Sequence, residues 1–440
     1  SFQGPAGVLE LTGTTISGGL LGGFAGTIAG LNDGASPTVP TNAIDLAGLA
    51  PSSITSASLN TSTDVLTVDT TGGSFALQLS GSYDAGAQVY SITDGSGGTE
   101  LFLDSPDTWS GATSTAWALA TNWSAGIPTS TSDVTIPKTT INQPTLSGST
   151  IINSLTLTDT TAGDGTLTIN TGVALTVTAA TPSATTVNLS GSAAKISLSG
   201  TGALTTNGGI TLVSGASIAI TTGNLTSTSA TFGITNAGTI TDAGGAISAT
   251  GAAGISNTGT ISGTGAITGA LSGAGVDLAS GGNLDITSAV NSGVTGLQIA
   301  AASTLELDNT VAFGDTVTFN SAASGVLDLT SSSISGNQLG GFAATIAGLN
   351  VGSSDTSPTN EIDLRGLSIG SIQSAIFTSA SVITVTNTAG QSFTLQLASA
   401  PAAGTGIHTI SDGSGGANLF LSADPVFTMK EGGVDSWADA

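Results

Sequence analysis

The stretch Ile234-Thr-Asn-Ala-Gly-Thr-Ile240 recurs 21 residues later as Ile255-Ser-Asn-Thr-Gly-Thr-Ile261. In each copy apolar residues frame a polar, glycine-containing segment, which favours short strands separated by tight turns. A strand rises about 3.3 Å per residue, so this period fits one coil of three short strands. The repeat therefore predicts a β-solenoid with coils of about 20 residues, in which inward aliphatic side chains stack from coil to coil.

The surrounding residues, 137–318, contain many short segments in which apolar and polar residues alternate, as in half-buried strands. We assign the solenoid to this range. Asn236 and Asn257 fall at the same point of successive coils, where they either form an asparagine ladder or serve as turn residues. Segments of this kind include Leu155-Thr-Leu157, Leu167-Thr-Ile169, Leu175-Thr-Val177, Val187-Asn-Leu189 and Ile196-Ser-Leu198.

A second repeat frames the solenoid, because residues 7–103 recur 318 positions later as residues 325–421. We assign one β-rich module to residues 1–104 and its copy to residues 319–423. In the first copy, strands are expected near 44–46, 54–59, 64–69, 74–79, 88–93 and 100–103, with a tight turn at Asp94-Gly-Ser-Gly-Gly98. The spacing of Leu21, Phe24, Ile28 and Leu31, repeated at Leu339, Phe342, Ile346 and Leu349, predicts a short helix or an irregular cap.

Residues 105–136 form a different segment that contains Trp109, Trp117 and Trp123. An aromatic cluster that closes one end of the solenoid is the favoured interpretation, and a platform that stacks on carbohydrate is the alternative. Residues 424–440 end in Trp437-Ala-Asp-Ala440, which is similar to Trp117-Ala-Leu-Ala120. We therefore expect residues 424–440 to begin a further linker, and the two modules to mark successive joints of an end-to-end fibre.

The composition supports an all-β protein. Only 7% of the 440 residues are charged while 39% are hydrophobic, so the surface is made of Thr, Ser and Gly rather than of helix-type charges. A net charge of −24 disfavours nucleic acid and anionic membranes as partners. The uncharged stretch from Leu11 to Leu31 has the length of a membrane span, but its polar content and its recurrence at 329–349 predict a module element and no membrane insertion. The absence of cysteine fits a secreted bacterial protein and also a cytosolic one.

The Asn-x-Gly-Thr-Ile coils resemble the passenger regions of bacterial autotransporters and filamentous-haemagglutinin-like adhesins. The segment Trp109-Ser-Gly, Trp117 and Asn122-Trp123 resembles the tryptophan segment that begins solenoid repeats in such proteins, and the duplicated module resembles the linkers between those solenoids. The resemblance implies an exported, right-handed β-helix that is displayed outside a bacterial cell. We therefore expect an adhesin-like or fibre-forming protein that associates head to tail, with cell-surface carbohydrate as a further candidate partner.

Catalytic chemistry is restricted by the residue types present. There is no cysteine, and the single histidine, His408, occupies the position of Tyr90 in the first module, so nucleophilic triads and histidine zinc sites are disfavoured. A solenoid polysaccharide lyase or hydrolase is the alternative function, since Glu306 and Asp308 share one strand face and Asp277 and Asp285 could lie near them. The competing interpretation is that these acids are solvated strand residues.

Calcium is the candidate cofactor, because carboxylates and turn carbonyls are oxygen ligands. Asp45, Asp94, Asp363 and Asp412 recur in both modules and are the candidate ligands; otherwise no cofactor is expected. Outward Thr-x-Thr pairs, such as Thr156 with Thr158, leave ice binding as a minor alternative. The sequence thus predicts an all-β chain: a β-solenoid with coils of about 20 residues, flanked by two copies of a β-rich module. The resemblance implies that the solenoid is right-handed.

Overall fold

The computed structural model describes residues 1–2, 7–31, 33–34, 42–81, 83, 87–138, 142–161, 165–294, 296–321, 324–352 and 358–423. The expected linker at 424–440 lies outside the described residues. The chain divides into two compact units, Ser1–Leu167 with Leu175–Pro182, and Thr168–Ala174 with Ser183–Ala440. The described part contains strands and no α-helix; its helical turns are the 3-10 turns η1 (Pro51–Ser53), η2 (Ala120–Asn122) and η3 (Ile369–Ser371). The predicted all-β class is confirmed.

The first module contains two sheets and a short hairpin. One sheet has the order β1 (Val8–Glu10), β6 (Ala43–Leu46), β11 (Thr99–Asp104) and β10 (Gln88–Thr93), with β5 (Asp33–Gly34) also paired to β11. The other has the order β4 (Thr27–Ala29), β9 (Gly73–Ser80), β8 (Val65–Thr70) and β7 (Ile54–Asn60). The hairpin pairs β2 (Ile16–Ser17) with β3 (Leu20–Leu21).

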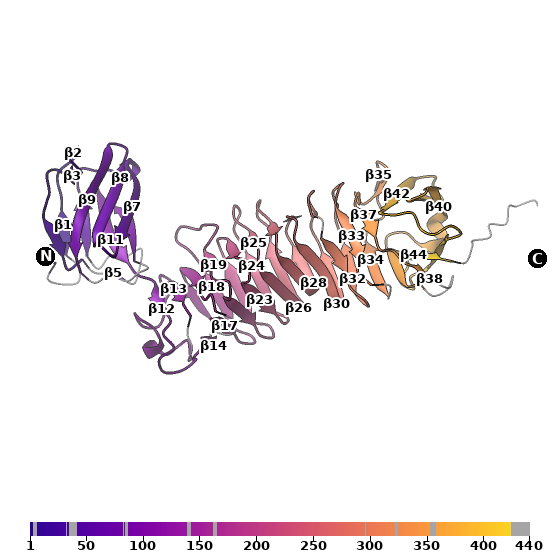
Figure 1. Cartoon of the computed structure of the whole chain (residues 1–440), viewed down its shortest axis with the longest axis horizontal. Coiled ribbons are helices and arrows are strands. Elements are labelled where there is room, and N and C mark those ends of the chain that lie inside the picture. Colours follow the sequence, from indigo (N-terminus) through magenta and orange to yellow (C-terminus); the bar gives the residue numbers. More distant parts are fainter. Residues whose placement is uncertain are drawn as a thin grey trace, which may run out of the picture. The chain divides into compact units, whose positions relative to one another are not determined.

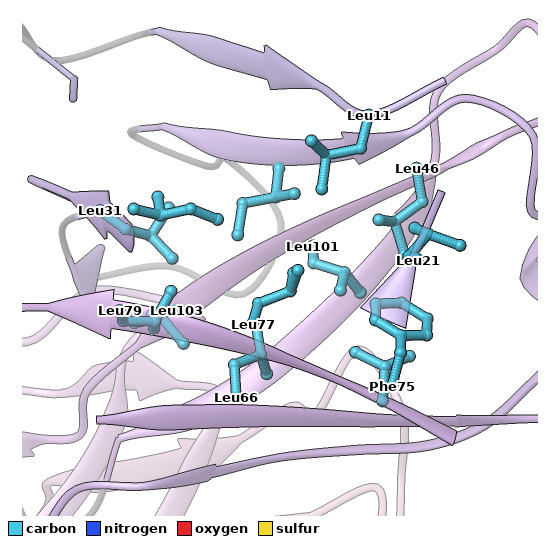
Figure 2. Packing of buried hydrophobic residues seen from close by; sticks show 13 residues of the cluster. Leu11, Leu21, Leu31, Leu46, Leu66, Phe75, Leu77, Leu79, Leu101 and Leu103 are labelled. Atoms are coloured by element: carbon cyan, nitrogen blue, oxygen red, sulfur yellow. The ribbon is translucent and has the colours of Figure 1, made fainter. Parts of the chain in front are cut away.

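Both sheets contribute to one hydrophobic core, in which Leu46 and Leu101 lie together with Leu66, Phe75 and Leu77 (Figure 2). The alternation of apolar and polar residues along β9 places one face of the strand in this core. Phe75, Leu77 and Leu79 are buried, while their neighbours are exposed. The strands predicted from 44 to 103 are therefore confirmed, as is the turn at Asp94–Gly98 between β10 and β11.

The helix predicted from the spacing of Leu21, Phe24, Ile28 and Leu31 is wrong, and its alternative, an irregular cap, describes the segment better. Gly22 and Gly23 follow β3 with φ values of 56° and 74°, which end any regular helix. Leu21, Ile28 and Leu31 are nonetheless buried, so their spacing reflects packing of a looped chain.

The tryptophan segment of the first unit is a packed cluster. Trp109 and Trp117 both contact Trp123 edge to face, with ring centroids 4.8 and 4.6 Å apart. All three rings are buried, which supports the packing interpretation over a carbohydrate platform. Asn122 accepts from the backbone N–H groups of Thr113 and Ser114 and ties the surrounding loop together. The strands around the cluster are β12 (Asp107–Thr108), β13 (Asp133–Ile136), β14 (Thr145–Leu146), β15 (Thr150–Ile152) and β16 (Ser154–Leu157).

Long parallel ladders fill the first part of the second unit. One ladder contains β19 (Val187–Leu189), β22 (Ile210–Leu212), β25 (Ile234–Asn236), β27 (Ile255–Asn257) and β29 (Leu271–Ser272). A second contains β20 (Lys195–Leu198), β21 (Ala203–Thr206), β23 (Ser217–Ile220), β24 (Asn224–Ser227), β26 (Thr239–Ala249), β28 (Thr260–Thr268), β30 (Val276–Ile286), β31 (Leu297–Ile299), β32 (Thr304–Leu307) and β33 (Thr316–Phe319). Strands β17 (Thr166–Ile169) and β18 (Ala174–Val177) span the division between the two units.

These ladders have the register that the sequence repeat predicts. Ile234 is opposite Ile255, and Ile240 is opposite Ile261, in parallel neighbours. Figure 1 shows β23, β26, β28, β30, β32 and β34 (Gly325–Leu329) as successive parallel strands. Large parallel sheets of this kind are consistent with a β-solenoid.

Aliphatic side chains stack along the inside of the second ladder. Ile196, Ile218, Ile240 and Ile261 follow one another in register, and each is fully buried. The parallel pairing aligns them, so each side chain covers its neighbours and the stack excludes water.

The second module repeats the strand order of the first. Its strands after β34 are β35 (Ile334–Ser335), β36 (Gln338–Leu339), β37 (Thr345–Ala347), β38 (Val351–Gly352), β39 (Asn360–Leu364), β40 (Ile372–Ser379), β41 (Val382–Asn387), β42 (Ser392–Leu397), β43 (Gly406–Ser411) and β44 (Ala417–Ser422). His408 stacks on Phe420 as Tyr90 stacks on Phe102, which confirms that the two residues hold equivalent places.

The aliphatic stack predicts a large cost for a charge at its centre. Ile240→Asp places an unpaired carboxylate among fully buried side chains and should lower the free energy of unfolding by about 3 kcal/mol or more. Thr241→Asp is the matched control, because Thr241 is exposed on the same strand and should change stability by about 0.5 kcal/mol or less. Equal denaturation midpoints for both variants would show that the inward face is assigned wrongly.

Candidate functional site

Four carboxylates lie in register across neighbouring parallel strands of the second unit. Asp285 on β30 is opposite Glu306 on β32, Glu306 is opposite Asp328 on β34, and Asp328 is opposite Asp363 on β39. Residues opposite one another in a sheet point to the same face, so these side chains form one line, which we call the acidic row. Like charges directly opposite each other are destabilising, so the row needs compensation.

Alternation along each strand places the acids on the outer face. The residues that flank them point inward and are buried; they are Leu284, Ile286, Leu305, Leu307, Leu327, Leu329, Ile362 and Leu364. Successive side chains of a strand point to opposite faces, so packing of these aliphatic residues forces the acids outward. Other groups nevertheless cover the row, since Glu306 is only 9% and Asp328 only 1% exposed.

One cation, Arg365, bridges the middle of the acidic row. Its Nη1 donates to Oε1 of Glu306 at 2.5 Å, and its Nη2 donates to Oδ2 of Asp328. Asn283 donates from Nδ2 to the other oxygen of Glu306 at 2.6 Å. Both oxygens of Glu306 are thus satisfied, whereas Oδ1 of Asp328 is buried and has no hydrogen-bond partner.

Burial and repulsion between carboxylates raise the pKa values of Asp285, Asp328 and Asp363. Burial, with repulsion from Asp363, raises the pKa of Asp328 to about 7 even though Arg365 lowers it. Burial, with repulsion from Asp308 and Glu306, raises the pKa of Asp285 to about 6. The pKa of Asp363 is also raised, first by burial and then by Asp412. These three aspartates therefore take up protons at pH values where ordinary carboxyl groups are ionised.

Asp285, Glu306 and Asp308 are the residues best placed to hold a metal ion. One ligand oxygen from each lies within 4.8 Å of the other two. Three carboxylates with no nitrogen or sulfur donor suit a hard cation such as calcium. The sequence predicted that Glu306 and Asp308 share a face and that Asp285 could lie near them, and the structure brings all three together.

Asp277 does not join this group. Its side chain points inward and is fully buried, and it accepts from Nδ2 of Asn257 at 2.8 Å. Asn257 in turn accepts from Nδ2 of Asn236 at 2.9 Å. The two asparagines therefore form a short ladder that ends on an acid, whose pKa burial raises to about 7. Each also accepts a turn N–H, from Gly238 and Gly259, so the ladder and the turn interpretation both hold.

The four calcium candidates lie in two pairs. Burial, with repulsion from Asp94, raises the pKa of Asp45, and burial, with repulsion from Asp412, raises the pKa of Asp363, so each pair is close enough to interact. Oδ1 of Asp94 accepts from the N–H groups of Ser96 and Gly98, at 2.6 and 2.8 Å. Asp412 makes the same two bonds in its own turn. Asp94 and Asp412 therefore stabilise turns, and calcium binding to the four aspartates remains a prediction.

The first module carries a similar line of acids without the arginine. Glu10 is opposite Asp45, and Asp45 is opposite Glu100. The residue 318 positions before Arg365 is Ala47, which has no charge. The sequence offered a signal for this difference, because aligning the two modules places an arginine beside the acids in only one of them.

Comparison with known proteins gives one match. A family model described as a domain of unknown function (DUF8693) matches residues 108–213, which include the tryptophan cluster and the strands from β13 to β22. No curated protein and no solved structure matches the chain. Among the described residues, no helix is long and apolar enough to cross a membrane.

Removal of Arg365 should destabilise the protein in a pH-dependent way. In Arg365→Met the carboxyl groups of Glu306 and Asp328 lose their cation, so the free energy of unfolding should fall by about 1–3 kcal/mol at pH 8. The loss should be smaller at pH 5, since carboxyls with raised pKa values, Asp285 and Asp328, are then largely protonated. Denaturant unfolding at both pH values measures this.

The unchanged protein gives the reference for that experiment. A carboxyl whose pKa is raised on folding contributes stability that is complete below its ordinary pKa and is lost as the pH rises through the folded value. Stability should therefore fall between pH 5 and pH 8. Lys195→Met is the control, because Lys195 is exposed on β20. An equal loss for Arg365→Met at both pH values would contradict the assigned role of the arginine.

Proposed function

We propose that this chain is a non-enzymatic structural protein: a right-handed β-solenoid with coils of about 20 residues that acts as a stiff spacer between two joint modules. In this proposal it works outside a bacterial cell, is adhesin-like or fibre-forming, and associates end to end with further copies.

The observation that carries this proposal is the continuity of the strand ladders from the repeats into the second module. β32 pairs with β34 and β34 with β39, while β33 pairs with β37 and β37 with β42. The module thus extends the backbone pairing and the aliphatic core of the last repeat. A joint of this kind transmits force along hydrogen-bonded ladders, which suits a spacer better than a flexible tether does.

The extracellular location and the end-to-end contact rest on different support. The location rests on the resemblance to autotransporter passengers and haemagglutinin-like adhesins. The head-to-tail contact rests on the duplication of the module and on the similarity of residues 424–440 to the tryptophan segment. A contact between different surfaces that does not close into a ring gives an open filament.

Assembly of the purified protein tests this function. Sedimentation velocity and negative-stain electron microscopy over a rising concentration series should show end-to-end oligomers, and removal of residues 424–440 should weaken them. A chain in which the sequence of residues 424–440 is scrambled controls for the length of the tail. A full chain that stays monomeric throughout the series would contradict the proposal.

A solenoid carbohydrate-active enzyme is the second candidate function, and the cluster of Asp285, Glu306 and Asp308 favours it. The raised pKa of Asp285, about 6, suits a general acid, and Arg365 lies beside the row. A cavity of about 540 Å³ lies elsewhere, lined mainly by residues 373–377 and 404–407.

We predict no cleavage of polygalacturonate or alginate, because a chain of net charge −24 repels polyanions. Product formation followed by absorbance or reducing-end assay measures this. Cleavage that disappears in Glu306→Gln, with the fold retained, would establish the enzyme instead.

A further inference from the structure

An acid interrupts the column of buried aliphatic side chains in the second unit. Ile261 on β28 lies opposite Asp277 on β30, Asp277 lies opposite Leu297 on β31, and Leu297 lies opposite Val317 on β33. All four side chains are fully buried. Opposed residues of neighbouring strands point to the same face, so Asp277 occupies a place that its neighbours fill with aliphatic groups. A carboxylate at such a place costs stability unless its charge is removed or compensated.

The hydrogen bonds around Asp277 satisfy only one of its two oxygens. Oδ1 of Asp277 accepts from Nδ2 of Asn257 at 2.8 Å, whereas Oδ2 is buried and has no hydrogen-bond partner. Asn257 is fully engaged, because its own Oδ1 accepts from Nδ2 of Asn236 and from the N–H of Gly259, and its Nδ2 also donates to the carbonyl of Val276. Among the described residues, one neutral amide is therefore the side-chain partner of this carboxyl.

No charged side chain of the described residues faces Asp277 from the strands packed against it. The residues opposite it on β28 and β31 are Ile261 and Leu297, and β27 contributes the amide of Asn257. On β30 itself the other titratable group is Asp285, which lies on the outer face in the acidic row. An ionised Asp277 would thus have no cation to offset its charge.

Two further buried acids of these ladders, Asp242 and Asp315, have different surroundings. Glycine N–H groups donate to Oδ1 of each of them. Neither contributes to the raised pKa of Asp277, which burial sets at about 7 against the smaller, opposite effect of the Asn257 amide. The fold therefore favours the neutral form of Asp277.

The backbone pairing also changes beside Asp277. The ladder that contains β25 and β27 ends at β29. Beyond β29, single bridges join Leu271 to Val290 and Val290 to Val311. Fewer backbone bonds on this ladder lower the cost of opening the neighbouring strands locally.

We propose that Asp277 makes the packing of β30 between β28 and β31 pH-sensitive: a neutral Asp277 keeps the aliphatic column closed, and local opening of these strands is coupled to the loss of its proton. This property is independent of the proposed assembly. A carboxyl whose pKa is raised on folding contributes stability that is complete below its ordinary pKa and is lost as the pH rises through the folded value. With a folded pKa of about 7, opening should become easier as the pH rises from 5 to 7 and should level off above pH 8.

Amide hydrogen exchange of the full chain tests the proposal. Val276 and Ala300 each donate a backbone N–H to a carbonyl of a neighbouring strand or turn, so both amides report opening around Asp277. After correction for the intrinsic rate at each pH, their opening constants should rise from pH 5 to pH 8. This rise should be about tenfold or more larger in the parent chain than in Asp277→Asn, which stays neutral. The amide of Ser217, on the distant strand β23, should behave alike in the two chains.

Two further variants separate Asp277 from other groups. Asp285→Asn removes an outer carboxyl of the same strand, and Asp277→Asn should reduce the rise by the same factor with and without it. Asp277→Leu fills the column with an apolar group while Asn257 keeps the carbonyl of Val276 as an acceptor. It should show the smaller rise even if Asp277→Asn loosens the strands at every pH. An equal rise in the parent chain and in both Asp277 variants would overturn the proposal, as would a rise that Asp285→Asn alone abolishes.

Discussion

Parallel backbone pairing in a fixed register aligns each inward side chain with the residue one strand earlier and one strand later. Ile196, Ile218, Ile240 and Ile261 show the result, a column of fully buried isoleucines. Each strand buries its apolar face only because its neighbours do the same, so the stack is cooperative along its length. Among the polar residues buried in the interior, Asn236, Asn257 and Asp277 bond to one another, and Oδ2 of Asp277 is left without a hydrogen-bond partner.

The same register that builds the core also creates the acidic row. A pairing that aligns Leu305 with Leu327 must also align Glu306 with Asp328 on the opposite face. The protein compensates with Arg365, with the amide of Asn283 and with raised pKa values. The row is thus a consequence of how the second module is joined, and its charge balance sets how firmly that joint holds as the pH changes.

The alternation of apolar and polar residues, together with the sequence repeats, predicted many of the strands. Alternation in segments such as Phe75-Ala-Leu-Gln-Leu79 located the module strands, and the repeat at Ile234 and Ile255 located neighbouring strands in register. The spacing of Leu21, Phe24 and Ile28 predicted a short helix that the structure does not have. Apolar spacing alone cannot show that Gly22 and Gly23 adopt positive φ values, which end a helix.

The acidic row was harder to predict, since it depends on the lengths of the connections between strands. Thr260 pairs with Val276, only 16 residues on, whereas Ile240 pairs with Ile261, 21 residues on. Because the number of residues per repeat varies, the sequence alone does not show which acids lie opposite each other on neighbouring strands. Arg365 lies 59 residues from Glu306 in the sequence and comes from the module, so inspection of the solenoid range alone could not supply it. The sequence suggested both Asp277 and Asp285 as neighbours of Glu306. Only Asp285 lies beside it, because the side chain of Asp277 points inward.

The central claim is that the repeats and the second module share one continuous parallel ladder, and a designed disulfide tests it most directly. The chain has no cysteine, so Thr304→Cys with Val326→Cys forms an unambiguous pair on directly opposed residues. Neighbouring strands lie about 4.8 Å apart, within the range of a disulfide. A continuous ladder predicts rapid oxidation of this pair in the folded protein, and none for Asn283→Cys with Val326→Cys, which are one strand farther apart. Equal oxidation of the two pairs, or none at residues 304 and 326, would contradict it.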